Sequence, residues 1–310
     1  MEEWGTVTPP VLVLLGATAT GKSALAVDVA LALAESGQPA EIVNADSMLV
    51  YRGMDIGTAK PAPAERRGVP HHLIDTMDIA EPASVAVFQA AARAAIADCR
   101  ARGVVPVVVG GSALYLHAII DAVDFPPTDA AVRSRWAGEL ERLGPAALHA
   151  QLAGLDPVAA AGIDPGNGRR IVRALESVEL TGRFAATLPE WSYALDGVTQ
   201  IGLALDRTTM DARIVARVEA MWRAGFVAEV ERLVAAGLRD TPTAARAIGY
   251  RQVMAYLDGQ ITEAEAKERT IIRTRQFARK QLAWWKRDPR IRWLPAGCDA
   301  AAVLAAAWRM

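Results

Sequence analysis

The chain has 310 residues, 52% of them hydrophobic and 22% charged, and this composition excludes a disordered chain and allows one large core plus a second unit. The formal net charge of -1 excludes a global attraction to polyanions, so any nucleic-acid partner must meet a local basic patch. Two cysteines are too few for a disulfide framework or a zinc site, which indicates a reducing cytoplasmic compartment.

The N-terminal segment MEEWGTVTPP lacks the basic-then-apolar order of a signal peptide. No apolar run in the sequence approaches the ~20 residues that a membrane span needs. We therefore expect a protein that acts in the cytoplasm and has no membrane partner.

The first apolar run and the loop after it predict a phosphate site. Val11–Leu15 is aliphatic and predicts a strand, and the pattern G-x-x-x-x-G-K-S follows it, before an apolar, helix-prone run. The two glycines let successive backbone N–H groups point at one anion, the lysine adds a charge, and the serine hydroxyl suits Mg²⁺. The sequence therefore predicts a diphosphate or triphosphate site made by Gly16, Ala17, Thr18, Ala19, Thr20, Gly21, Lys22 and Ser23, with Ser23 as the metal ligand.

The helix after this loop is expected to end near Ser36, and Ala40–Asn44 reads as a second buried strand. Asp46 follows that strand, and the carboxyl ends of parallel strands are where open α/β sheets bind ligands. Asp46 is thus a candidate for chemistry. The alternative, that Asp46 or Ser47 only caps the next turn, is equally compatible with the spacing.

The segment Val50–Pro61 has no helical or strand period and predicts a loop rich in polar groups. His71 and His72 follow, and a metal pair is one interpretation of them. Adjacent histidines do not face one another on a helix or a strand, and no other His or Cys lies near them in the sequence. Packing or capping is therefore the favoured interpretation of both.

A helix from Ser84 to Gly103, a buried strand at Val104–Val109 and a helix at Ala113–Asp121 complete three strand–helix units. They predict an α/β fold: a P-loop NTPase-like parallel sheet with helices on both faces. Two glycines, Gly110 and Gly111, stand where a common ATPase has a Walker-B aspartate, which disfavours hydrolysis or motor function.

The sequence changes character after these units, since only short helical stretches follow up to about Gly197. They are expected at Asp129–Leu143, Pro145–Gly154, Pro157–Ala161 and Asn167–Thr181. This region predicts a small all-helical domain inserted into the core. The predicted domains are residues 1–123 with 198–310 for the core and 124–197 for the insert.

Two arginine groups of the middle region could meet an anion. Arg169, Arg170 and Arg173 fall within one turn of the last inserted helix, although such a basic turn is usually a solvated face. A strand at Thr199–Leu205 precedes a helix at Thr208–Ala224, on which Arg213 and Arg217 share one face and could reach the phosphate site. Salt bridges from these two to Asp211 or Glu219 are the alternative.

The C-terminal region holds the local basic patch. After helical pieces at Phe226–Ala236 and Ala244–Leu257, a capping box at Thr262 opens a helix that can run to Arg287. Between Lys267 and Arg292 there are ten basic residues and two acids, which favours contact with a nucleic-acid backbone. Helical spacing puts Arg269, Arg273, Gln276, Lys280 and Arg287 on one stripe with Trp284 at its edge, and Ile271, Ala278, Leu282 and Trp285 on the opposite, core-facing stripe.

Six segments, in order and over nearly the whole chain, resemble the bacterial tRNA dimethylallyltransferases, also called tRNA isopentenyltransferases. They are GATATGKS, NADSMLVYRGMDIGTAKP, VVVGGSALYL, RRIVRALE, ARAIGYRQ and RQFARKQLAWW. The second and the last are long and specific. Two positions depart from the usual pattern, because Ala17 stands where the family usually has proline and Thr20 where serine is common.

The resemblance implies transfer of a dimethylallyl group from dimethylallyl diphosphate to N6 of adenine 37, next to the anticodon of tRNAs that read codons beginning with U. It implies Mg²⁺ as the cofactor and no obligate protein partner. It makes Asp46 the general base, puts the Thr18 hydroxyl near the reacting centre and favours Arg217 over Arg213 at the leaving diphosphate. The matching tRNA-contacting positions are Asp46, Ser47, Met48, Leu49, Ser112, Arg133, Arg169, Arg170, Ile171, Val172, Arg173, Arg246, Gly249, Tyr250, Arg251, Arg279, Lys280, Gln281 and Trp284.

Two other enzyme classes remain open. A small-molecule P-loop kinase would use the insert as a lid and Asp46 to bind the acceptor hydroxyl. An adenylate isopentenyltransferase would run the same chemistry on a free nucleotide. Neither gives the basic C-terminal helix a role. A non-enzymatic RNA-binding module leaves the phosphate loop unused.

Overall fold

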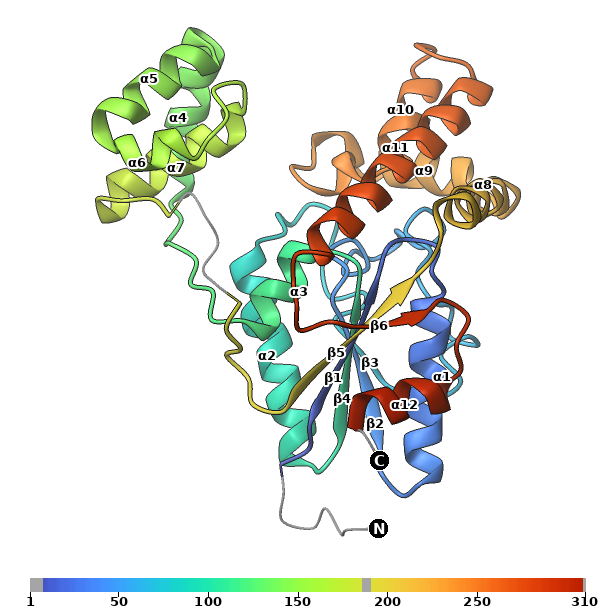
Figure 1. Cartoon of the computed structure of the whole chain (residues 1–310). Coiled ribbons are helices and arrows are strands. Elements are labelled where there is room, and N and C mark those ends of the chain that lie inside the picture. Colours follow the sequence, from blue (N-terminus) through green and yellow to red (C-terminus); the bar gives the residue numbers. More distant parts are fainter. Residues whose placement is uncertain (1–7, 186–190, 309–310) are drawn as a thin grey trace. The chain divides into compact units, whose positions relative to one another are not determined.

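A computed structural model of the chain describes residues 8–185 and 191–308 (Figure 1). The chain divides into two compact units: the larger combines the chain up to Asp121 with the chain from Tyr193 onward, and the smaller is Ala122–Ser192. The sequence put the boundaries at 123/124 and 197/198. The observed division differs because Asp121 and Tyr193 pair as an antiparallel bridge, which ties both residues to the larger unit.

The larger unit is built on one sheet of six strands, all paired in parallel, in the order β3-β2-β4-β1-β5-β6. This confirms the predicted α/β class. The strands that the sequence predicted are all present, as four of the six. The bounds are Val11–Gly16 for β1, Ala40–Asn44 for β2, His71–His72 for β3, Val105–Gly110 for β4, Val198–Ala204 for β5 and Arg292–Pro295 for β6.

Helices cover both faces of the sheet (Figure 1). Successive residues of a strand point to opposite faces. Leu12 and Leu14 accordingly share a core with α1 (Lys22–Glu35) and α12 (Ala300–Trp308). Val11, Val13 and Leu15 share the other core with α2 (Val85–Ala101) and α3 (Ala113–Ile120). Since β1 is buried on both faces, its sequence is a continuous aliphatic run rather than an alternating one.

Further helices of the larger unit lie beyond the carboxyl ends of the strands (Figure 1). They are α8 (Arg207–Arg223), α9 (Phe226–Ala235), α10 (Tyr250–Leu257) and α11 (Glu263–Trp285). The capping box that opens α11 is confirmed, since the Thr262 hydroxyl accepts the Glu265 amide and the Glu265 carboxylate accepts the Thr262 amide. The predicted helix Ala244–Leu257 is wrong in its first part: Gly249 has a φ of 91°, so a 3-10 turn at Ala244–Arg246 precedes a helix that begins at Tyr250.

The smaller unit contains the four predicted helices, α4 (Ala130–Leu143), α5 (Pro145–Leu155), α6 (Pro157–Ala161) and α7 (Gly168–Thr181). They enclose a core of their own that includes Leu148, Leu152 and Leu175. Residues 186–190 of the segment after α7 lie outside the described residues, as do residues 1–7 of the N-terminal segment. Over the ranges that the structure describes, no helix combines the length and the apolarity needed to cross a membrane.

Candidate active site and arginine groove

The loops that follow β1, β2 and β4 meet at a pocket of about 90 Å³ in the larger unit. Seven of the predicted site residues line it, from four different parts of the chain: Thr18, Lys22, Ser23, Asp46, Leu49, Arg217 and Gln281. The phosphate loop and Asp46 had been predicted separately, each from its position after a strand. The sheet brings them together because β1 and β2 both pair with β4.

The phosphate loop has the geometry of an anion cradle. Gly21 has a φ of 87° and caps α1 without any side chain, so the first N–H groups of the helix are left for a ligand. Inside the loop, the buried Thr20 hydroxyl donates to the Ala17 carbonyl at 2.9 Å. A side chain at Gly16 would approach that hydroxyl to 2.9 Å, closer than real Cβ contacts. The loop's own residues therefore contribute to holding its shape.

Lys22 is one of the cations that line the pocket. Burial lowers the pKa of its amine to about 8, while the negative charge of Asp46 raises it and the positive charge of Arg217 lowers it further. The amine also donates to the Ala17 carbonyl at 3.4 Å. A partly desolvated ammonium gains more from an anionic ligand than a solvated one does, which suits a bound diphosphate.

Asp46 is held rigidly by its neighbours. The Asn44 side chain accepts the Asp46 amide at 2.8 Å and donates to the Asp46 carbonyl at 2.9 Å. Asp46 Oδ1 in turn accepts the Met48 amide at 2.9 Å, so the capping alternative is part of the structure. It does not exclude the chemical one, because the same carboxylate lines the pocket with Lys22 and Arg217. Among the described residues, Oδ2 accepts no hydrogen bond.

The structure distinguishes the two arginines of α8. Arg217 lines the pocket and donates to the Thr58 carbonyl at 3.3 Å. Burial lowers its pKa and Asp46 opposes that effect. Arg213 is exposed and, within the part of the chain that the structure describes, its guanidinium reaches only the Ala19 carbonyl, at 3.5 Å. The suggested salt bridges from these arginines to Asp211 and Glu219 are wrong, because both acids pair with basic residues of α11.

Gln281 has a different role from the predicted tRNA contact. Its side chain is buried, accepts the Thr18 amide at 3.0 Å and donates to the Gly111 carbonyl at 2.7 Å. A Cβ at Gly111 would lie 2.6 Å from the Gln281 amide nitrogen, which explains the glycine. Gln281 therefore joins α11 to the phosphate loop and to the end of β4. No local pattern could reveal a hydrogen bond between residues 281 and 18.

The predicted tRNA contacts Gly249 and Tyr250 are corrected as well, because both residues are buried. The Tyr250 hydroxyl donates to the buried Glu229 at 2.6 Å, and Glu229 also accepts amides of Asp55, Ile56 and Gly57. This carboxylate fixes the predicted loop Val50–Pro61. Three residues of that loop line the pocket although the sequence did not single them out: Thr58, Ala59 and Pro61.

Two aromatic residues near the pocket were also missed. Phe277 of α11 lines the pocket and is 41% exposed. The sequence signal that could have revealed it is an aromatic residue among the basic residues on one side of this helix. Tyr115 of α3 lies close enough to Asp46 for the negative charge of Asp46 to add to the rise in the Tyr115 pKa that burial causes. Burial raises the pKa of the Tyr115 phenol to about 12, so it stays neutral. Ser47, Met48 and Ser112, predicted as tRNA contacts, are half-buried.

A second cavity, of about 870 Å³, lies between α10 and α11 of the larger unit. Five arginines and a single aspartate are the charged groups that line it, and the aspartate, Asp258, pairs with one of them. We call this cavity the arginine groove. It joins Arg246 and Arg251, predicted from one segment, to Arg269 and Arg273, predicted from the basic stripe, with Arg239 as the fifth. This concentration of charge fits a phosphate backbone.

The rest of the basic stripe is less uniform than predicted. Lys280 is exposed as expected, but Arg279 pairs with Asp211 of α8 at 3.5 Å. Trp284 packs edge-on against His117 and Trp285, so it belongs to the core and is not an exposed stacking surface. The predicted core positions Ala278 and Trp285 are confirmed as buried.

The smaller unit uses two of its predicted arginines internally. Arg133 and Arg173 both pair with the buried Glu176, at 2.9 and 2.7 Å. Burial alone would raise the Glu176 pKa, but hydrogen bonds from Arg173, from the Asp129 amide and from Arg133 hold it below its usual range. The predicted side-chain contacts of Ile171 and Val172 with tRNA are corrected, since both side chains are buried in the core of this unit. Arg169 and Arg170 are exposed.

Comparison with known proteins places these features in a family. Residues 49–288 match the family model described as IPP transferase. The chain is 59% identical over 293 residues to the tRNA dimethylallyltransferase of Kineococcus radiotolerans, covering 93% of this chain and 91% of the relative. It is 57% identical to that of a Nocardioides species, covering 92% and 91%.

Solved structures agree. A tRNA isopentenylpyrophosphate transferase from Bacillus halodurans is 36% identical, with a TM-score of 0.69 over 96% of this chain and 94% of that one. A eukaryotic dimethylallyltransferase, in a structure described as acting on tRNA, is 25% identical, with a TM-score of 0.74 over 97% and 77%. The chain belongs to the IPP transferase family.

Proposed function

We propose that this chain transfers a dimethylallyl group from dimethylallyl diphosphate to N6 of adenine 37 in tRNAs that read codons beginning with U. The observation that carries the proposal is the pocket in which a carboxylate, Asp46, faces the cations of an anion-binding loop and of α8. The names of the relatives, tRNA dimethylallyltransferase and tRNA isopentenylpyrophosphate transferase, support it.

The proposed reaction needs a group that accepts a proton and a site that stabilises a leaving anion. N6 of the adenine attacks the terminal allylic carbon, the bond from that carbon to the diphosphate oxygen breaks, and N6 loses a proton. We assign the proton to Asp46. The leaving diphosphate is assigned to Lys22, Arg217 and the first amides of α1, which are fixed in place before the reaction and therefore require little reorganisation.

Ser23 and Thr18 are the other two residues that we assign to binding of dimethylallyl diphosphate. Ser23 stands at the start of α1 and lines the pocket, as a serine that holds Mg²⁺ beside a diphosphate must do. When bound, the ion supplies positive charge to the leaving group. The Thr18 amide is held by Gln281, which leaves its hydroxyl as the group that acts near the reacting carbon.

The arginine groove is the proposed binding surface for the tRNA backbone. Its charge supports a polyanionic acceptor in place of a free nucleotide or a small alcohol, for which the groove would have no role. The target base must leave its stack to reach the pocket. We assign the half-exposed ring of Phe277, at the pocket, to contact with the extruded adenine.

A comparison of acceptors tests the proposal. The chain is incubated with labelled dimethylallyl diphosphate and either unmodified tRNA or AMP, with labelled ATP and no prenyl donor as a third arm. Label is expected on tRNA alone. Label on AMP alone would identify an adenylate isopentenyltransferase, and transfer of phosphate from ATP would identify a kinase; either result contradicts the proposal.

A further inference from the structure

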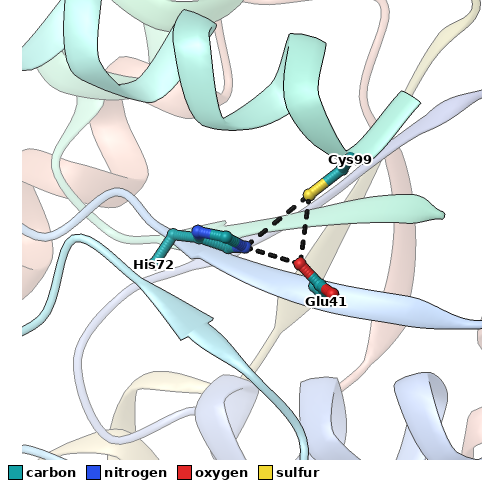
Figure 2. A group of neighbouring side chains, drawn as sticks. All are labelled: Glu41, His72 and Cys99. Carbon is teal, nitrogen blue, oxygen red and sulfur yellow. Dashed lines mark hydrogen bonds and ion pairs between the residues drawn. The ribbon is translucent and has the colours of Figure 1, made fainter. Parts of the chain in front are cut away.

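Glu41, His72 and Cys99 form a compact cluster that the proposed reaction does not use (Figure 2). Glu41 Oε2 lies 2.7 Å from His72 Nε2 and 3.5 Å from Cys99 Sγ, and the sulfur lies 3.7 Å from His72 Nε2. Glu41 is the second residue of β2, whereas Asp46 follows the end of that strand. The cluster therefore lies away from the carboxyl edge of the sheet, where the pocket forms.

Three elements of the fold bring these side chains together. Val43 of β2 pairs with His72 of β3, so Glu41, two residues earlier in β2, shares a sheet face with His72. Helix α2 packs on that face and contributes Cys99. All three donors thus come from regular secondary structure of one compact unit, which gives a more rigid arrangement than a loop does.

The donor set suits one class of cation. A carboxylate oxygen, an imidazole nitrogen and a thiolate sulfur are ligands that Zn²⁺ and similar borderline divalent cations accept. The two distances to sulfur, 3.5 and 3.7 Å, match the edges of about 3.3–3.8 Å in a tetrahedron built from Zn–N and Zn–O bonds near 2.0–2.1 Å and a Zn–S bond near 2.3 Å. The Glu41–His72 separation is that of a hydrogen bond and must open by about 0.6 Å.

The surroundings of the cluster permit binding. Cys99 is buried, while the Glu41 and His72 side chains are 13% and 28% exposed, so a cation has a route in from solvent. Arg102 donates to both Glu41 oxygens, at 2.8 Å to Oε1 and 2.7 Å to Oε2. Arg102 Nη2 also lies 3.7 Å from Cys99 Sγ, so its contacts with Oε2 and the sulfur must give way to a cation, while Nη1 keeps its hydrogen bond to Oε1 and orients the ligand.

We propose that Glu41, His72 and Cys99 bind a zinc-type divalent cation, with the fourth tetrahedral position open to water. The sequence argued against such a site, because it holds two cysteines and because adjacent histidines cannot face one another. The second argument is correct for the pair, since only His72 joins the cluster while His71 lines the pocket. The first fails because one cysteine suffices when a histidine and a glutamate from other elements complete the set.

Such a site would tie the short edge strand β3 to β2 and α2. The residue after His72, Leu73, accepts a hydrogen bond from Asn44, and Asn44 also holds the Asp46 backbone. The cation would therefore stabilise the edge of the sheet that adjoins Asp46. This inference does not depend on which reaction the pocket catalyses.

Cobalt provides a spectroscopic test on the full chain. Co²⁺ titration of the reduced protein should give one site per chain with a thiolate-to-cobalt charge-transfer band, and Zn²⁺ should displace it. A cysteine binds a cation as its thiolate, so binding should release about one proton per cation, which calorimetry in buffers of different ionisation enthalpy measures. A site at the phosphate loop has no thiolate and cannot give this band.

Variants assign the band to the cluster. Cys99→Ser should abolish it and weaken Co²⁺ binding by about 100-fold or more, beyond the 10–100-fold cost of losing an outer partner of a ligand. Cys298→Ser is the matched control and should retain the band, and His72→Gln should lose tight binding even if Cys99→Ser fails to fold. A wild-type chain without the charge-transfer band, or an unchanged band in either cluster variant, would overturn the proposal.

Discussion

Asp46→Asn separates the chemical role of Asp46 from its structural one. Asn keeps an oxygen in the Oδ1 position, so the 2.9 Å hydrogen bond from the Met48 amide and the Asn44 contacts can persist. The loss is then confined to the negative charge and to the ability to accept a proton. Removing a general base slows a reaction by roughly 10²–10⁴-fold, or about 2.7–5.5 kcal/mol of activation free energy.

The same substitution has a second expected effect, on Lys22. Burial lowers the pKa of Lys22 to about 8 and the charge of Asp46 opposes that effect, so Asp46→Asn should lower the pKa further. The assay should therefore be single-turnover prenyl transfer near pH 6.5, where Lys22 stays protonated, at saturating donor and tRNA. The exposed Asp78, paired with Arg52, provides the control Asp78→Asn.

The expected result is a slow variant that still binds both substrates, beside a control of wild-type rate. Two results would refute the reasoning. A rate within about threefold of wild type would show that Asp46 accepts no proton in the rate-limiting step, because the loss expected for a general base is at least about 100-fold. Loss of donor and tRNA binding together would show that its charge maintains the site.

Further predictions concern the anion and the tRNA. Lys22→Arg should remove a pH dependence of diphosphate binding, because the lowered pKa of Lys22 makes the amine neutral above about pH 8 whereas the guanidinium of the variant stays charged. Between pH 8 and 9.5 the affinity of the wild type for diphosphate should fall on the order of tenfold relative to that of the variant. Parallel pH profiles of the two proteins would show that Lys22 does not titrate in this range. Gln281→Leu should leave the Thr18 amide and the Gly111 carbonyl without a hydrogen-bond partner, and each unpaired group costs about 1–3 kcal/mol of stability. The variant should therefore have a lower Tm and a higher KM for dimethylallyl diphosphate. An unchanged Tm would contradict the proposal that Gln281 braces the phosphate loop. Neutralising Arg269 and Arg273 together should weaken tRNA binding and reduce its salt slope by about 2, and a slope equal to that of wild type would place the backbone elsewhere.

The parts of the fold that could be predicted are those with a local signal. The strand before Gly16, the phosphate loop and the helix after it follow from a few consecutive residues, and the capping box at Thr262 spans four. The edge strands β3 and β6 have two and four residues, too few for any period to appear. The composition of Ala244–Leu257 favoured one continuous helix, but Gly249 has a positive φ and the helix begins only at Tyr250.

The residues of the candidate site likewise divide into those that a local sequence signal could predict and those that it could not. Asp46 could be predicted because it follows a strand, and the parallel sheet carries such residues to one edge. Gln281 and Glu229 could not be predicted, because their hydrogen bonds to the loops around the pocket join residues 170 or more positions apart in the chain. Family resemblance assigned Ile171 to tRNA as part of a segment, but the helix turns its side chain into the core.

The most direct measurement is mass spectrometry of nucleosides from tRNA treated with the chain and dimethylallyl diphosphate. A dimethylallyl group on N6 of the adenine next to the anticodon, absent when either the donor or the enzyme is omitted, is the predicted result. Release of diphosphate without a change in any nucleoside, or a dimethylallyl group at another position, would contradict the proposed transfer.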